Sequence, residues 1–244
     1  MAIVNKTIEY SCGDQTHHGY MAWDDSVEGQ HPGVMVIHEW WGLNDYMRQR
    51  ADMLAALGYC ALAIDMYGGG YQASNPDEAG AAMNQVLGDM ETCTARLNAA
   101  YEALIGLEQV DPGRTAAQGY CFGGAMALHM ARVGMPLKAA VSFHGALGSF
   151  HTPEPGEVKA RILVCHGGDD AMVTMDDLAA FRAEMDAAGA DYEVIVHAGA
   201  AHGFTSTAAD ENGRKYGIPV GYDADADSQS WKAMQELYAS CLGG

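Results

Sequence analysis

Basic residues are scarce in this chain of 244 residues: 13 Lys and Arg stand against 32 Asp and Glu, which gives a net charge of −19. Surfaces that bind nucleic acid or anionic membranes need clustered Lys and Arg. The charge therefore excludes nucleic acids and membranes as expected partners. It favours solubility and does not identify a substrate.

Long apolar runs and paired cysteines are also missing. No apolar stretch approaches the roughly 18 residues that span a bilayer. The opening MAIVNKTIEYSCG lacks the basic and apolar regions of a secretion signal. The six cysteines form no CxxC pair, and Cys60 and Cys165 fall within apolar runs. We therefore expect free cysteines and a cytoplasmic, reducing location.

Apolar and helical segments alternate along the chain, and 49% of its residues are hydrophobic. This length and pattern predict a single α/β domain over residues 1–244, with a mainly parallel central sheet and helices on both faces. The expected strands are 6–13, 17–23, 33–38, 59–65, 114–120, 137–145, 160–168 and 191–199. The expected helices are 44–57, 75–107 in two pieces, the segment after Cys121, 174–189 with Thr174 as N-cap, and 228–242.

Chemically capable side chains follow four of the apolar runs: HEWWGLN, GYCFGG, HGGDDAMV and HAGAAHGF. Sites in sheets of this kind lie just beyond the carboxyl ends of the strands. We therefore expect these four stretches to converge on one edge of the sheet. That convergence is a stronger indication of a site than any one of the motifs.

Cys121 stands in the pattern Gly-x-Cys-x-Gly between a strand and a helix, with Gly119 and Gly123 as its frame. A reactive residue at such a turn is a nucleophile elbow, which more often carries serine. The N-terminus of the following helix favours the thiolate form of a cysteine. The alternative is a structural cysteine in a glycine-rich turn.

His202 and an acid near residue 170 follow the cysteine in the order that this fold uses for a catalytic triad. The spacing within HGGDDAMV favours Asp170 over Asp169 as the acid that orients His202, with Val173 closing the motif. His202 would take the thiol proton and later return it. The alternative for His202 is an ordinary loop histidine.

The stretch HEWWGLN is predicted to supply one oxyanion-hole N–H, from Trp40, and the residue after the nucleophile, Phe122, the other. Glu39 is unexpected beside a thiol, and its alternative role is a loop-ordering salt bridge to Arg48 or Arg50. The residues predicted to line the substrate pocket are Trp41, Tyr67, Tyr71 and Phe204.

The stretches VIHEWWGLNDY, DMYGGG, GYCFGGA, VSFHG, HGGDDAMV and GAAHGFT together resemble the dienelactone hydrolase family of α/β-hydrolases, over nearly the whole chain. The resemblance implies the α/β-hydrolase fold and a Cys-His-Asp triad at Cys121, His202 and Asp170. It also implies that Glu39 contacts the resting thiol and moves when substrate binds. The activity implied is hydrolysis of a small-molecule ester or lactone by a monomer or small homo-oligomer, with no cofactor and no metal.

One departure concerns the substrate. Members of the family that act on dienelactone hold its carboxylate with pocket arginines, yet this chain has no Arg or Lys from Met66 to Cys93. We therefore expect uncharged or weakly charged esters to be preferred over dienelactone itself.

Four other functions are alternatives to an ester hydrolase. A thioesterase or another Cys-dependent acyl transferase would use the same residues, and a non-catalytic binding protein could keep the scaffold. In a class I glutamine amidotransferase, the histidine and the acid stand two residues apart and both follow the nucleophile. Here the sequence that begins at His202 is HGF, which has no acid at that spacing. A zinc site would have to be built from His166, Asp169, Asp170 and His202, without HExxH or CxxC spacing to support it.

Overall fold

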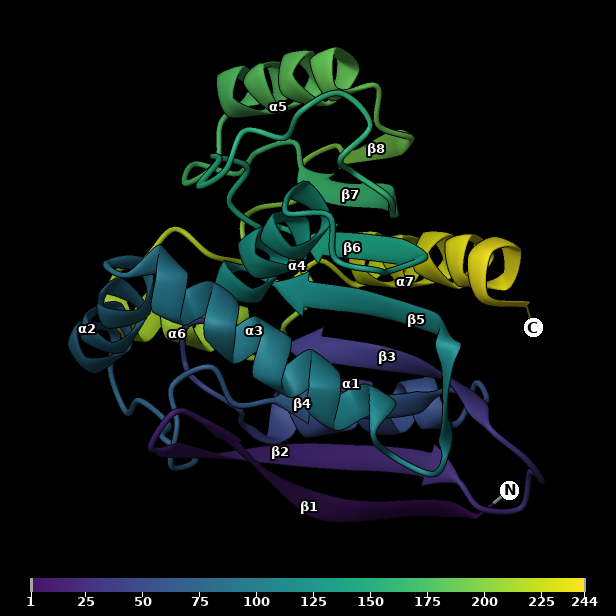
Figure 1. The fold of residues 1–244 in the computed structure, drawn as a ribbon. Helices are drawn as coiled ribbons and strands as arrows, with labels where there is room; N and C mark the ends of the chain where they lie inside the picture. Colours follow the sequence, from purple (N-terminus) through teal and green to yellow (C-terminus); the bar gives the residue numbers. More distant parts are fainter. Residues whose placement is uncertain (1, 244) are drawn as a thin grey trace. The chain divides into compact units, whose positions relative to one another are not determined.

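The computed structural model describes residues 2–243. By the density of its internal contacts the chain divides into two compact units, Met1–Ala117 and Gln118–Gly244. Figure 1 shows the helices and strands of both units, coloured along the sequence. The prediction of a single domain over 1–244 stays a prediction.

The first unit holds the antiparallel part of the sheet. β1 (Ile3–Cys12) and β2 (Gln15–Asp24) form a hairpin, β2 pairs antiparallel with β4 (Cys60–Ile64), and β4 pairs parallel with β3 (His31–Ile37). Every residue of β3 and β4 is buried, as expected for strands in the middle of a sheet. The helices of this unit are α1 (Asp45–Ala55), α2 (Pro76–Leu87) and α3 (Met90–Ile105).

Side chains at the helix starts explain where these helices begin. Asn44, Asn75 and Asp89 are the N-caps of α1, α2 and α3, and each accepts a hydrogen bond from a first-turn backbone N–H. Gly88 ends α2, so the segment 75–107 forms two helices, as predicted.

The strand pairs formed by β6 (Ala139–Phe143), β7 (Arg161–Gly167) and β8 (Tyr192–His197) in the second unit are parallel. β6 pairs with β7, and β7 pairs with β8. Its helices are α4 (Phe122–Arg132), α5 (Met175–Ala188), α6 (Ala209–Tyr216) and α7 (Ala224–Tyr238), followed by a π-helical turn over Ala239–Gly243. Every residue of α4 is buried, so the helix that follows Cys121 lies within the core.

The hydrogen-bonded strand order is β1-β2-β4-β3-β5-β6-β7-β8, and β5 (Val110–Tyr120) begins in the first unit and ends in the second. The sheet is therefore mixed but mainly parallel, as predicted. Thr174 caps α5 in a capping box with Asp177, which confirms the predicted N-cap.

Several elements differ from the predictions, including β5, which begins at Val110 rather than at 114. The hairpin strands are ten residues each, longer than 6–13 and 17–23, because hairpin pairing continues past the apolar core of each strand. Helix α6 was not predicted, since ADENGRKY is almost wholly polar and buries only Ala209. Helix α7 starts at Ala224, four residues before the predicted start at 228, because Asp223 is its N-cap. Among the described residues, no helix is both long and apolar enough to cross a membrane.

Candidate active site

Cys121 occupies the sharp turn between β5 and α4, with φ 53° and ψ −115°. A non-glycine residue with positive φ costs on the order of 1 kcal/mol, so the rest of the fold must hold this turn. The Cys121 N–H donates to the Phe143 carbonyl at 3.1 Å. A side chain at Gly119 would place its Cβ 2.0 Å from the Gly123 oxygen, so only glycine allows the strand and helix to approach this closely. The turn leaves the Cys121 side chain half-buried at the N-terminus of α4.

His202 and Asp170 are joined by a hydrogen bond of 2.8 Å between His202 Nδ1 and Asp170 Oδ2, and both residues are buried. The other carboxylate oxygen, Asp170 Oδ1, accepts from the backbone N–H groups of Met172 and Val173 at 2.8 and 2.9 Å. These two bonds hold the Asp170 carboxylate in the orientation in which its other oxygen bonds His202. Asp169 is exposed to solvent, so the structure brings Asp170 and not its neighbour to His202.

The protonation of this pair follows from its surroundings. Burial disfavours the charge on Asp170, but the His202 hydrogen bond and the two backbone donors hold its pKa below the usual value. Burial likewise opposes charge on His202, yet its interactions with Cys121 and Asp170 raise its pKa to about 10. At neutral pH the imidazole therefore carries a proton that it could give to a leaving group.

His144 is a site neighbour that sequence reasoning missed. It follows β6 with φ 42°, and its ring packs edge-on against the His202 ring with centroids 5.3 Å apart. Its Nε2 is 2.7 Å from the hydroxyl of Thr205, three residues after His202. His144 thus holds the His202 loop from one side. Its signal in the sequence was its position directly after a buried strand in VSFHG.

The loop that carries Glu39 and Trp40 is tied to the end of β4. His38 Nε2 accepts from the Met66 N–H at 3.1 Å, so its Nδ1 carries the hydrogen and donates to the Glu39 carbonyl. Burial lowers the pKa of His38, which keeps the ring neutral. The Tyr67 hydroxyl donates to the Trp40 carbonyl at 2.8 Å. Sequence reasoning also missed His38, although it is the first residue after a buried strand.

Two backbone features bear on the predicted oxyanion donors. Within residues 2–243 the Trp40 N–H donates to no protein group, which leaves it available to a ligand. Phe122 is the first residue of α4, where backbone N–H groups have no partner within the helix. Glu39 is buried, with 7% of its surface exposed. Arg48, one of the two arginines predicted as its salt-bridge partner, pairs with Asp45 at 2.6 Å.

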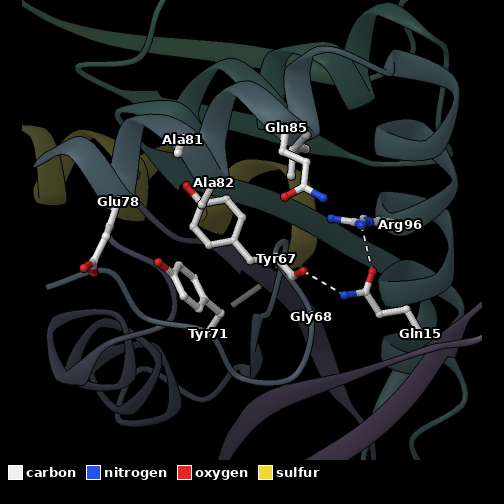
Figure 2. A pocket seen from close by; sticks show the side chains of 10 residues that line it. Gln15, Tyr67, Gly68, Tyr71, Glu78, Ala81, Ala82, Gln85 and Arg96 are labelled. Carbon is white, nitrogen blue, oxygen red and sulfur yellow. Dashed lines mark hydrogen bonds between the residues drawn. The ribbon is translucent and has the colours of Figure 1, made fainter. Parts of the chain in front are cut away.

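Asp65 shapes the turn that follows β4. Its two carboxylate oxygens accept from the N–H groups of Tyr67, Gly68 and Gly70 at 2.8 to 3.0 Å. Glycines 68 to 70 all have positive φ, which explains why this turn reads GGG. The turn presents Tyr67 and Tyr71 to a cavity of about 470 Å³ (Figure 2).

The cavity contains an arginine that lies outside the stretch Met66 to Cys93. No Arg or Lys occurs from Met66 to Cys93, but Arg96 of α3 lines the cavity beside Tyr67. Arg96 lies one helical turn beyond Cys93, and the fold brings α3 to the turn that follows Asp65. The preference for uncharged esters over dienelactone stays a prediction.

The remaining predicted residues lie as follows. Trp41 packs against Trp40 with ring centroids 5.1 Å apart. Phe204 is fully buried, between the rings of His144 and His197. Among the described residues, no group of three or more His, Cys, Asp or Glu side chains is arranged to hold a metal ion.

Comparisons with known proteins agree with this architecture. The sequence profile of the dienelactone hydrolase family matches residues 17–242. A dienelactone hydrolase-like promiscuous phosphotriesterase from metagenomic libraries is 36% identical, with a TM-score of 0.91 over 100% of both chains. A candidate carboxymethylenebutenolidase of Aquifex aeolicus is 26% identical over 216 residues, which is 86% of this chain and 89% of the relative. An α/β-hydrolase from a Medee basin deep-sea metagenome library has a TM-score of 0.70 at 15% identity, covering 98% of each chain, and is similar in fold alone.

The mainly parallel sheet, with Cys121 at a strand-to-helix turn and His202 bonded to Asp170, defines an α/β-hydrolase. The chain belongs to the dienelactone hydrolase family. The predictions of this family, this fold and a hydrolase that cleaves esters or lactones are confirmed.

Proposed function

We propose that the chain hydrolyses small carboxylic esters or lactones through a thioester intermediate on Cys121. The observation that supports this most lies in the second unit, where the buried Asp170 carboxylate bonds the imidazole of His202, whose pKa is raised in part by the nearby Cys121. A buried carboxylate that orients an imidazole beside a thiol is the arrangement that activates a cysteine nucleophile.

The proposed reaction has two halves. The Cys121 thiolate attacks the carbonyl carbon to form a C–S bond, while backbone N–H groups of Trp40 and Phe122 bind the oxyanion. The C–O bond then breaks, and the leaving alkoxide takes a proton from the His202 imidazolium. In the second half His202 accepts a proton from water, the hydroxide attacks the thioester, and the C–S bond breaks to release the acid and regenerate the thiolate.

The direct test is product formation from a panel of p-nitrophenyl esters, lactones and thioesters. We expect turnover of oxygen esters that is lost after alkylation of the protein. A phosphotriester belongs in the panel because a relative 36% identical is named as a promiscuous phosphotriesterase. Turnover of thioesters alone would instead favour a thioesterase, and absence of any turnover would favour a binding protein.

Glu39 is proposed to modulate the thiol. A carboxylate near Cys121 would keep the thiol neutral at rest, whereas an imidazolium beside it would keep it ionised. We expect Glu39→Gln to speed iodoacetamide alkylation of Cys121 at neutral pH and to slow ester turnover. The measurement is the alkylation rate against pH for wild type and variant. Identical profiles would mean that Glu39 is structural and that His202 alone sets the state of the resting thiol.

Tyr67 is expected to position the proposed oxyanion donor through its hydroxyl. Tyr67→Phe keeps the ring but removes the bond to the Trp40 carbonyl. Losing one neutral hydrogen bond of about 1 kcal/mol predicts a kcat about fivefold lower, with KM little changed. The control is Tyr20→Phe, which removes a comparable hydroxyl bond, to Asp52 at 2.9 Å. A change in KM with an unchanged kcat would assign Tyr67 to ground-state binding instead.

A further inference from the structure

The cavity in the first unit has the size and lining of a ligand site. Its volume of about 470 Å³ lies in the range of small-molecule pockets. It is lined by the turn after β4, by one face of α2 and by two side chains from β2 and α3. The lining residues are Gln15, Tyr67, Gly68, Tyr71, Glu78, Ala81, Ala82, Gln85, Val86 and Arg96.

Helix α2 gives this cavity two distinct ends. Glu78, Ala82 and Gln85 fall on one helical face, at spacings of four and seven residues. Seven residues of helix separate Glu78 from Gln85 by about 10 Å. The two alanines, Ala81 and Ala82, leave the wall between these ends open. Figure 2 shows Glu78 and Arg96 at opposite ends, with Tyr67 and Tyr71 between them.

At the other end, the Arg96 guanidinium forms hydrogen bonds within the protein. Arg96 donates to the Met66 carbonyl at 2.8 Å and to Gln15 Oε1 at 2.7 Å. Gln15 in turn donates from its Nε2 to the Tyr67 carbonyl at 3.0 Å. The guanidinium therefore braces the turn that carries the tyrosines.

The Glu78 end carries a negative charge on a side chain that is exposed to solvent. One carboxylate oxygen accepts the Ser74 N–H at 2.8 Å, and no cationic side chain pairs with Glu78 within residues 2–243. The rings of Tyr67 and Tyr71 meet edge-on with centroids 6.2 Å apart, and Tyr71 is 42% exposed. Tyrosine faces attract cations, and a nearby carboxylate adds to that attraction.

We propose that this cavity binds the ammonium group of a small organic cation, between the tyrosine rings and the Glu78 carboxylate. The net charge of −19 favours the approach of such a ligand. The proposed binding rests on the cavity alone and does not depend on the proposed hydrolase function.

The binding test compares choline with its neutral isostere 3,3-dimethylbutanol, by isothermal titration calorimetry on the full chain. We expect choline to bind about tenfold more tightly, and Glu78→Gln to remove most of that difference. Glutamine keeps an oxygen for the Ser74 N–H, so the cap of α2 is preserved. The matched control is Glu91→Gln, which removes the same charge from an exposed first-turn position of α3 and should leave the preference intact. Equal binding of the two compounds, or equal losses in both variants, would overturn the proposal.

Tighter binding of a carboxylate than of choline would assign the cavity to Arg96 instead.

Discussion

Cys121→Ala is expected to abolish ester hydrolysis, lowering kcat by at least about 10⁴-fold, while the fold remains intact. Alanine has no group that can attack a carbonyl, and it is smaller than the half-buried cysteine that it replaces. Both residues have a Cβ, so the strain of the positive φ at this position is the same in the two proteins. The measurement is steady-state hydrolysis of p-nitrophenyl acetate, with circular dichroism and Tm to show that the variant is folded.

The control for this variant is Cys12→Ala, at another cysteine that is partly accessible to solvent. Wild-type turnover is expected there. Mass spectrometry after a brief exposure to ester substrate should find an acyl group on Cys121 and on no other cysteine. A Cys121→Ala enzyme with near wild-type kcat would remove the thiol from the mechanism and direct attention to a water-mediated reaction.

Asp170→Asn is expected to lower kcat by about 10⁴-fold. The carboxamide can still accept from the Met172 and Val173 N–H groups through its oxygen, which leaves its NH₂ facing His202 Nδ1. Nδ1 must then act as the acceptor, so the neutral ring carries its hydrogen on Nε2 and cannot take a proton there. The loss of the carboxylate also removes one of the interactions that raise the pKa of His202 to about 10.

Asp169→Asn provides the matched control, because it makes the same chemical change at the adjacent, exposed position. Its turnover is expected to stay close to that of wild type. The pH profile adds a readout that a structural role would not move: the limb set by His202 should shift to lower pH in Asp170→Asn and stay in place in Asp169→Asn. The reverse ranking of the two variants would reassign the acid.

The order of elements and the stretches that carry the site could be predicted because both depend on local patterns. β3, β4 and β6 are buried along their whole length, and such strands form continuous apolar runs in the sequence. The glycines around Cys121 and the spacing from His166 to Val173 reflect tight backbone geometry, which few residue types satisfy. Both the apolar runs and the glycine spacings arise within a single segment of chain, so they can be recognised without knowing its distant contacts.

The parts that could not be predicted depend on contacts between distant segments. Arg96 reaches the turn after Asp65 across 30 residues of chain to the Met66 carbonyl, and nothing local marks it as a pocket residue. His144 meets Thr205 across a separation of 61 residues. The polar helix α6 has almost no buried face, so its sequence lacks the apolar periodicity from which a helix is predicted.

Helix α2 forms one wall of the 470 Å³ cavity while contributing little to the core, since only Ala79 and Val86 of its twelve residues are buried. Substitutions at Glu78, Ala82 and Gln85 would change the charge, width and polarity of the cavity at small cost in folding free energy. The catalytic candidates in the second unit occupy other elements altogether. Point mutations in this one exposed helix would therefore change what the cavity can hold while leaving Cys121, Asp170 and His202 in place.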